Sequence, residues 1–140
     1  MEDDGLLTRL VHGREDRLVH VHRIPPRSAA TTPWPSWLPD AVRAAYVDAG
    51  ISTPWRHQSE AAEAAYRGDH VALATGTASG KSLAFGMVAL TRILAGTHAP
   101  DGRGSTVLYL SPTKALAHDQ LRSLTGLGLP WLRAADYDGD

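Results

Sequence analysis

The chain has 140 residues, of which 43% are apolar and 21% charged, with no cysteine and a formal net charge of −1. This length suits a single domain, and the apolar content is too high for a disordered segment. Without cysteine there is no disulfide framework, thiolate zinc site or thiol nucleophile, and a near-neutral charge does not by itself indicate nucleic-acid binding.

The sequence shows no targeting or membrane signal. Its first four residues include three acidic ones, whereas a secretory signal begins with a basic segment. The longest apolar stretch, residues 82–96, is interrupted by Thr91 and Arg92 and is shorter than the roughly 20 residues that span a bilayer. We therefore expect a cytoplasmic protein with no membrane partner.

The chain divides into two parts by composition. Residues 1–39 are expected to form an irregular, proline-rich lead-in, and residues 40–140 to form the domain proper. Within the lead-in, residues 18–24 alternate apolar and polar side chains, as a short strand would.

Two kinds of side chain in the lead-in have competing interpretations. Trp34 and Trp37 are expected to anchor the proline-rich stretch to the core, in preference to stacking on nucleic-acid bases. His20 and His22, with His12 nearby, are expected to be surface histidines in preference to metal ligands, because no cluster of carboxylates accompanies them.

Two helices are expected at the start of the domain. The first covers residues 40–49 and ends at Gly50, a residue that often follows a helix. Its apolar face would consist of Val42, Ala45, Tyr46 and Ala49. The second helix would begin at residues 52–54, where hydroxyl side chains and a proline form a typical helix start, and would run to about Arg67.

After the second helix the pattern alternates between strand and helix. Residues 70–75 and 106–110 are short apolar runs typical of buried parallel strands. Helices are expected over 81–95 and from a cap at residues 111–112 to about residue 124. This order predicts an α/β fold with a parallel sheet flanked by helices.

The loop between the first strand and its helix carries the strongest chemical signal. Gly76 and Gly80 allow a tight turn whose N–H groups point at phosphate oxygens, and the following helix adds its positive end. Lys81 would reach the β- and γ-phosphates, and the Ser82 hydroxyl would bind Mg²⁺. Thr75 stands where the pattern G-x-x-x-x-G-K-[ST] begins with glycine. The alternative is a glycine-rich turn before an ordinary helix with a surface lysine.

Gln58 is a polar residue on an apolar stripe of the second helix. The other members of the stripe are Trp55, Ala62, Ala65 and Tyr66. A buried carboxamide needs partners for its donor and its acceptor, and adenine supplies a matching pair. The alternative is a glutamine bonded to nearby backbone. The predicted nucleotide-binding residues are therefore Gln58, Thr75, Gly76, Thr77, Ala78, Ser79, Gly80, Lys81 and Ser82.

Residues 111–120 follow the second strand, and ligands of parallel sheets bind beyond the carboxyl ends of the strands. Lys114, His118 and Arg122 would form a cationic stripe on the helix, which suits a phosphate backbone. The inward-facing residues would be Ala117, Leu121 and Leu124. From this segment alone, an ordinary solvated helix face is the favoured alternative.

Three motifs in this order resemble the opening of superfamily 2 DEAD/DEAH-box helicases. The motifs are residues 56–58, 74–82 and 111–120, and the resemblance covers nearly the whole chain. It is strongest to the bacterial DNA helicases of the mitomycin-repair-factor type. The resemblance implies a RecA-like P-loop NTPase lobe that binds ATP and Mg²⁺ and acts on nucleic acid, DNA more than RNA, in DNA repair.

The resemblance also implies roles for single residues. Gln58 would read adenine, and Lys81 would be the catalytic lysine of the nucleotide site. The residues that match the motif gripping the phosphates of one strand are Pro112, Thr113, Lys114 and Gln120. Residues 137–140 look like the start of the next conserved element, which supports the same strand.

Several parts of such a helicase do not occur in these 140 residues. They are the acidic DExH motif, the Ser-Ala-Thr motif and the second RecA-like lobe with its arginine fingers. Because an ATPase of this type gathers its charge-stabilising groups from both lobes, we expect an N-terminal fragment, an incomplete first lobe that hydrolyses ATP negligibly alone. Its partner would be the missing downstream lobe.

Two other functions stay open. The chain could be a non-catalytic module that binds nucleotide or single-stranded DNA without turnover. A P-loop small-molecule kinase is less favoured, because neither the helix of Gln58 nor the segment 111–120 is expected of that class.

Overall fold

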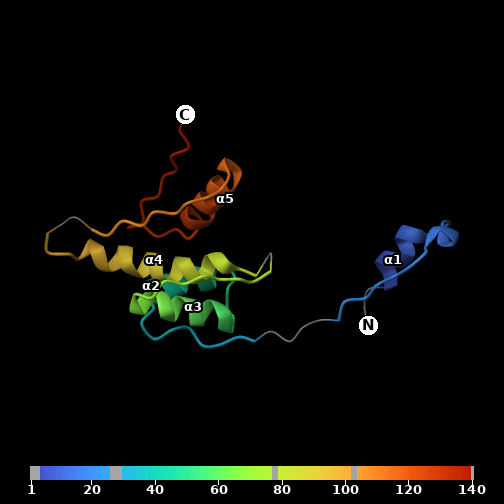
Figure 1. Cartoon of the computed structure of the whole chain (residues 1–140), viewed down its shortest axis with the longest axis horizontal. Helices are drawn as coiled ribbons and strands as arrows, with labels where there is room; N and C mark the ends of the chain where they lie inside the picture. The colour runs from blue at the N-terminus through green and yellow to red at the C-terminus, as the bar shows by residue number, and fades with distance from the viewer. Residues whose placement is uncertain (1–3, 26–29, 77–78, 102–103, 140) are drawn as a thin grey trace.

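The computed structural model of the chain describes residues 4–25, 30–76, 79–101 and 104–139. Its elements in chain order are α1 (Asp4–Val11), the 3-10 helix η1 (Glu15–Arg17), α2 (Asp40–Asp48), α3 (Arg56–Arg67), α4 (Lys81–Thr97) and α5 (Lys114–Thr125). Figure 1 shows α1 set apart from α2 to α5, which form one body. Among the described residues, no helix is both long enough and apolar enough to cross a bilayer.

The core of this body lies around α4. α3 packs along α4, and α2 also contacts it. Met87 and Leu90 on α4 are 0% and 1% exposed. The buried cluster consists of Leu38, Val42, Tyr46, Ala62, Leu83, Met87 and Leu90. The apolar character of α4, which the sequence predicted as a helix over 81–95, is explained by this central position.

α2 confirms the helix expected over residues 40–49. Val42 and Tyr46 face the core, and Gly50 ends the helix with a φ of +90°, a conformation that glycine adopts without strain. The Tyr46 hydroxyl lies against Gly86 of α4, where a Cβ atom would overlap it.

The burial of Tyr46 has a consequence at alkaline pH. Burial raises the pKa of the Tyr46 phenol to about 12, whereas the phenol of the unfolded chain ionises near its ordinary pKa of about 10. The folded state therefore binds the proton more tightly. The resulting stabilisation is fully present below about pH 10 and is lost as the pH rises toward 12.

Two tryptophans hold the lead-in against the helices, as the sequence predicted. The Trp34 ring stacks on Tyr46, with centroids 6.1 Å apart, and its Nε1 donates to the Ser52 carbonyl at 3.0 Å. The Trp37 ring stacks on Tyr66, with centroids 4.1 Å apart and an interplanar angle of 4°. Their anchoring role is thus confirmed.

α3 begins two residues later than the sequence predicted. Trp55 is extended and forms an isolated antiparallel bridge with Thr31, and the Thr32 amide donates to the Pro54 carbonyl. This pairing with the lead-in holds Pro54 and Trp55 in an extended conformation, so the helix starts only at Arg56. Trp55 is 47% exposed, so its expected place on the buried stripe is wrong.

The N-terminal region differs from the prediction. α1 was not predicted, although Leu6 and Leu10 have helical spacing that could have indicated it; both are exposed. Residues 18–24 form no strand, because no described segment pairs with them. His20 and His22 stack on each other with ring centroids 6.4 Å apart, and no group of three metal-ligating side chains occurs in the described ranges.

The predicted parallel sheet is not formed by the described residues. Residues 70–76 and 104–110 have no regular secondary structure and pair with no described strand, and Leu108 and Leu110 are 81% and 83% exposed. Strands need neighbours on their edges and a layer on each face, and two strands alone are marginal in water. The chain accordingly exposes 10,906 Å², against about 7,000 Å² for a compact protein of its mass.

Met87→Ala is expected to lower the free energy of unfolding by about 2–5 kcal/mol, because it removes a fully buried side chain and leaves a cavity. Urea denaturation followed by circular dichroism measures this change. Val47→Ala on the exposed side of α2 is the control and is expected to change stability by less than about 0.5 kcal/mol. Equal effects of the two substitutions would contradict this core.

Candidate functional site

Lys81, the lysine of the predicted phosphate-binding loop, places its ammonium group among oxygen atoms of that loop. α4 begins after Gly80, and the Lys81 Nζ donates to the carbonyl oxygens of Thr75 and Gly76 at 2.9 and 2.7 Å. The Ser79 hydroxyl oxygen lies 3.3 Å from the same ammonium group. The loop therefore holds a cation among its oxygens, at the place where the sequence predicted phosphates. The predicted residues Thr77 and Ala78 lie outside the described residues.

Thr75 has a structural role at the position where the motif begins with glycine. Its hydroxyl oxygen lies 2.7 Å from the Ser79 hydroxyl oxygen, within hydrogen-bond distance, and 3.4 Å from the Lys81 Nζ. The side chain thus joins the two ends of the loop. A glycine at position 75 would lack this bond, which gives a physical reason for the departure from the pattern.

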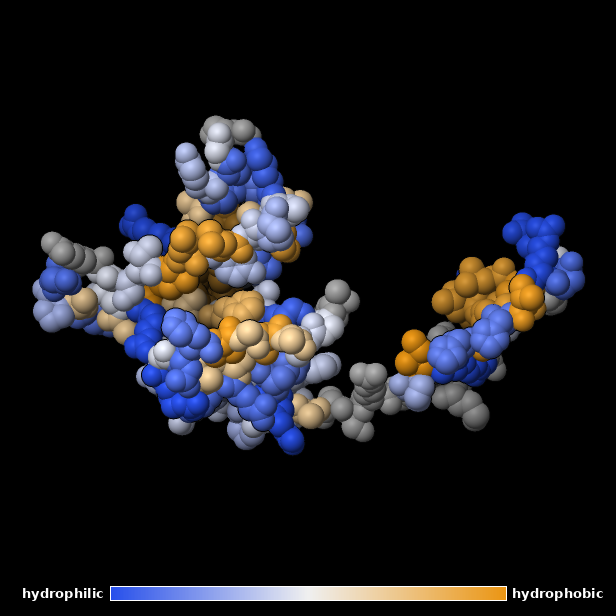
Figure 2. Space-filling view, viewed as in Figure 1, coloured by the Kyte–Doolittle hydropathy of each residue, from blue (hydrophilic) through white to orange (hydrophobic). Residues whose placement is uncertain are grey.

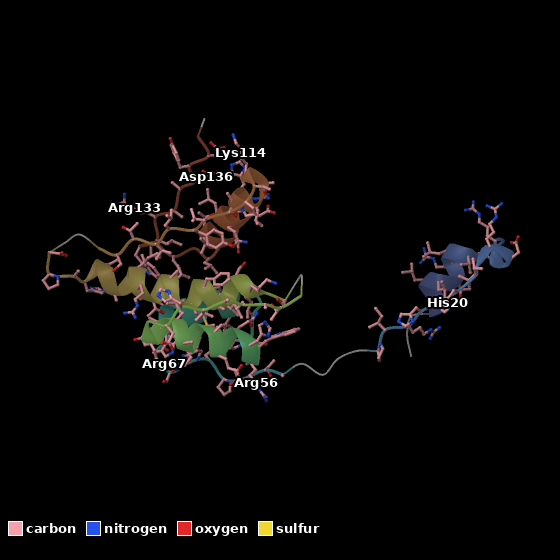
Figure 3. All side chains as sticks on the ribbon, viewed as in Figure 1. His20, Arg56, Arg67, Lys114, Arg133 and Asp136 are labelled. Atoms are coloured by element: carbon pink, nitrogen blue, oxygen red, sulfur yellow. The ribbon has the colours of Figure 1, made fainter. Side chains whose placement is uncertain are left out.

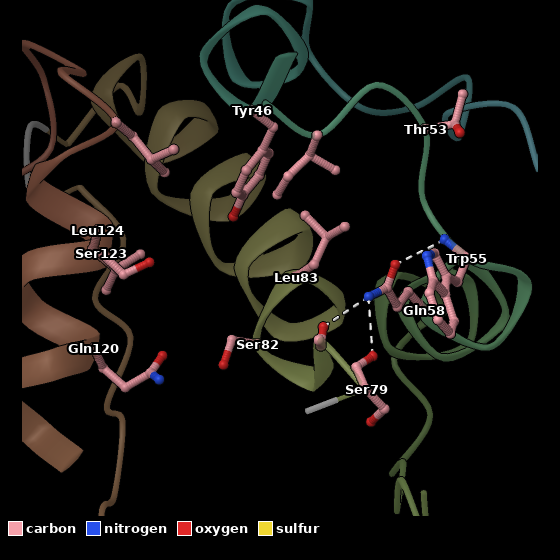
Figure 4. Close-up of a pocket in the computed structure, with 13 residues that line it drawn as sticks. Tyr46, Thr53, Trp55, Gln58, Ser79, Ser82, Leu83, Gln120, Ser123 and Leu124 are labelled. Atoms are coloured by element: carbon pink, nitrogen blue, oxygen red, sulfur yellow. Dashed lines mark hydrogen bonds between the residues drawn. The ribbon is translucent and has the colours of Figure 1, made fainter. Parts of the chain in front are cut away.

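The carboxamide of Gln58 ties α3 to this loop (Figure 4). Its Nε2 donates to the carbonyl oxygens of Gly80 at 2.9 Å and Ser79 at 3.3 Å. Its Oε1 accepts from the Trp55 amide at 2.8 Å, which caps the start of α3. Gln58 is 5% exposed, so these partners satisfy a buried amide. Both of its N–H donors contact backbone, and its predicted contact with adenine stays a prediction.

Position 80 requires glycine for two reasons. Its φ of +65° lies in the left-handed region, and a Cβ atom there would lie 2.5 Å from the Gln58 Nε2. A larger residue would both strain the backbone and displace the carboxamide. The sequence indicated the first reason, whereas the second depends on the packing of α3 against α4.

A cavity of about 390 Å³ opens beside the start of α4. Gln58, Gly80 and Ser82 line one side of it, and Gln120 and Leu124 of α5 line the other. Figure 2 shows hydrophobic surface on the body that α2 to α5 form. The Ser82 hydroxyl is exposed and has no hydrogen-bond partner among the described residues. Because Mg²⁺ takes oxygen ligands, this hydroxyl is a suitable ligand for it.

A second hollow, of about 430 Å³, lies at the N-terminal end of α5. Pro112, Thr113 and Lys114 line it, together with residues 137–139. Ser111 also lines it, and its hydroxyl is buried without a hydrogen-bond partner among the described residues. Gln120, which the sequence grouped with these residues, lies instead at the first cavity. The structure therefore brings together three of the four predicted nucleic-acid-binding residues.

The N-terminus of α5 corrects one detail of the sequence prediction. The helix is capped by Thr113, whose Oγ1 accepts from the Leu116 amide at 3.3 Å, and not by residues 111–112. Pro112 has no amide hydrogen, and it precedes an extended Thr113 that can turn its hydroxyl back onto the helix.

The basic side chains of the predicted stripe are present on α5, but each of them is paired with a carboxylate. Lys114 pairs with Asp138 at 3.4 Å, and the His118 Nε2 lies 2.7 Å from an Asp136 carboxylate oxygen. Figure 3 places Lys114 and Asp136 near each other at this end of the molecule. Arg122 pairs with Asp119 of the same helix. Sequence reasoning missed Asp136 as a partner, because the contact joins residues 18 positions apart.

His57 was also missed as a site residue. It precedes Gln58, is half-buried, and places its Nε2 3.0 Å from the Ser79 carbonyl oxygen. The available signal was its adjacency to a glutamine on a buried stripe, since neighbouring residues at a helix start both reach the element packed beside it.

Comparison with known proteins identifies relatives of this chain. The DEAD/DEAH box helicase family matches residues 55–137. The chain is 35% identical over 129 residues to the uncharacterized ATP-dependent helicase YprA of Bacillus subtilis strain 168, covering 89% of this chain and 16% of that protein. It is 32% identical over 106 residues to the ATP-dependent helicase hrq1 of Schizosaccharomyces pombe, covering 72% and 9%.

A similar fold occurs in a solved structure. The crystal structure of the DUF1998 helicase MrfA bound to DNA and AMPPNP has a TM-score of 0.72 and 34% identity, covering 85% of this chain and 16% of that one. The chain thus spans no more than 16% of the length of these relatives.

Gly80→Ala is expected to weaken the binding of inorganic tripolyphosphate, because the new Cβ would displace the Gln58 amide from the loop. Gly68→Ala is the matched control: it also has a positive φ, of 100°, but nothing lies within 4 Å of its Cβ. The left-handed backbone should cost both variants about 1–2 kcal/mol in stability, and Gly80→Ala should cost more because it also displaces the buried Gln58 amide. Titration calorimetry and urea denaturation separate the effects, and equal loss of anion binding in both variants would contradict this geometry.

Proposed function

Because this chain belongs to the DEAD/DEAH box helicase family, we propose that it is the ATP-binding part of an ATP-dependent nucleic-acid helicase or translocase. The observation that carries the proposal is the position of the Lys81 ammonium among the oxygens of the loop before α4. The similarity to ATP-dependent helicases and to MrfA, which was solved with AMPPNP, supports the same function.

ATP binding would exchange the partners of Lys81. Its ammonium would leave the carbonyl oxygens of Thr75 and Gly76 for β- and γ-phosphate oxygens, where it would serve as the catalytic cation. The N-terminus of α4 would add its positive end to the same site. Ser82 would hold Mg²⁺, which neutralises phosphate charge when bound. Gln58 would read adenine by exchanging its longer bond, to the Ser79 carbonyl, for the base, while its bond to the Gly80 carbonyl keeps the loop in place.

The proposed nucleic-acid site is the hollow at the start of α5. Lys114 and His118 would exchange their carboxylate partners for phosphates of one strand, and Pro112 and Thr113 would shape the surface beneath it. We take the strand to be DNA rather than RNA, because MrfA was solved bound to DNA. A role in DNA repair follows from the resemblance alone.

The 140 residues by themselves are proposed to bind ATP without turning it over. Hydrolysis in this class needs carboxylates that hold Mg²⁺ and position water. In the described part of the chain, the partners of Lys81 are carbonyl and hydroxyl oxygens, and no group of three acidic or histidine side chains is present. A non-catalytic binding module is therefore the second candidate function for the chain as it stands.

The parallel sheet belongs to the same proposal. Residues 70–75 and 106–110 would pair as strands within a longer polypeptide such as the relatives. The exposed apolar side chains of Val71 and of residues 107–110 support this role, since a sheet covered by helices would bury them.

Lys81→Ala is expected to weaken ATP binding about 10- to 100-fold, because the ammonium makes charge-assisted bonds to phosphate. Lys114→Ala should leave ATP binding unchanged and weaken single-stranded DNA binding instead, lowering the slope of log K against log salt by about 0.7. Fluorescence titration of each variant with both ligands tests the two sites. Loss of both ligands in either variant would contradict two separate sites.

Phosphate release from the purified chain with ATP and Mg²⁺ is expected to equal the background rate, with or without single-stranded DNA. Coupled-enzyme measurement of released phosphate tests this, and the Lys81→Ala variant provides the background. A steady release by the wild-type chain that Lys81→Ala abolishes would show that these residues suffice for hydrolysis.

A further inference from the structure

His57 contacts the phosphate-binding loop from the first turn of α3. Its Nε2 lies 3.0 Å from the Ser79 carbonyl oxygen. A carbonyl can only accept, so Nε2 must carry the proton. The Trp55 ring meets the imidazole edge to face, with centroids 5.8 Å apart and an interplanar angle of 87°, and holds it in this orientation.

The Ser79 carbonyl receives two bonds from α3. The Gln58 Nε2 lies 3.3 Å from the same oxygen, but it lies closer, at 2.9 Å, to the Gly80 carbonyl oxygen. His57 therefore makes the shorter contact with the Ser79 carbonyl, and Gln58 makes the contact with the next one. The two neighbouring side chains thus hold two successive peptide groups of the loop.

Holding a carbonyl oxygen also orients the amide of the next residue. In a trans peptide the C=O and N–H bonds point in opposite directions, and the described residues include no cis peptide. When the Ser79 carbonyl points at α3, the Gly80 N–H points away from α3. Backbone N–H groups at this place are those that a phosphate-binding loop uses.

We propose that His57 is a positioning residue for the phosphates of the nucleotide: it binds the Ser79 carbonyl and thereby turns the Gly80 amide toward them. This inference rests on the proposed ATP-binding function. The role differs from reading the base. Gln58, as an adenine reader, would affect ATP more than GTP, whereas His57 would affect every ligand that carries a triphosphate, by the same factor.

The test compares three ligands on the purified 140-residue chain and its variants by titration calorimetry: ATP, GTP and inorganic tripolyphosphate. The variants are His57→Leu, which removes the donor, and His57→Gln, whose amide nitrogen can reach the same carbonyl. His98→Leu, at the exposed histidine that follows α4, is the matched control. Urea denaturation of each variant shows whether it is folded.

His57→Leu is expected to weaken all three ligands by one common factor of about three- to tenfold, the effect of one lost hydrogen bond. His57→Gln and His98→Leu should stay within about twofold of the wild type. Unchanged affinities in His57→Leu, or a loss confined to ATP, would overturn the inference while leaving the proposed function intact. A wild-type chain that binds none of the three ligands would overturn both.

A second measurement does not depend on affinity. The amide chemical shift of Gly80, measured by NMR on the chain without nucleotide, should change in His57→Leu and be restored in His57→Gln, while His98→Leu leaves it unchanged. If the Gly80 amide resonance is the same in all variants, His57 does not orient that peptide and the inference is wrong.

Discussion

The candidate site depends on the bonds between the start of α3 and the loop before α4. A polar carboxamide, Gln58, is buried at this junction, and its partners are the carbonyl oxygens of Ser79 and Gly80 and the Trp55 amide. Because a buried amide without partners costs about 1–3 kcal/mol, the loop and the helix start hold each other in one arrangement. The Lys81 ammonium binds the other end of the loop, at the carbonyl oxygens of Thr75 and Gly76.

This junction also connects the site to the lead-in. Thr31 bridges to Trp55, and Trp55 donates to Gln58, which reaches the loop. On the other side, α4 continues from the loop into the centre of the core, where Met87 and Leu90 are buried. The loop is thus fixed at one end by polar contacts to α3 and at the other by the apolar packing of α4. Residues 70–74, which precede the loop, form no strand and lack such support.

The sequence allowed prediction of those features that local chemistry determines. The bounds of α2, the start of α4 and the loop with Lys81 follow from periodicity, glycines and a motif within a few residues. The start of α3 was mispredicted, because Thr31 pairs with Trp55 from 24 positions away. The pairing of His118 with Asp136 is likewise a contact between distant residues. Strand pairing depends on neighbours in the same way. The apolar runs at 70–75 and 106–110 therefore predicted strands, but the described residues form no sheet.

The central claim is that the loop between residues 75 and 82 receives the triphosphate of ATP. A crystal structure of the chain with a non-hydrolysable ATP analogue tests it most directly. The account predicts that the Lys81 Nζ leaves the carbonyl oxygens of Thr75 and Gly76 and contacts phosphate oxygens, while the Gln58 amide keeps its bond to Gly80. An analogue bound elsewhere, with the Lys81 ammonium still held by those carbonyls, would contradict it.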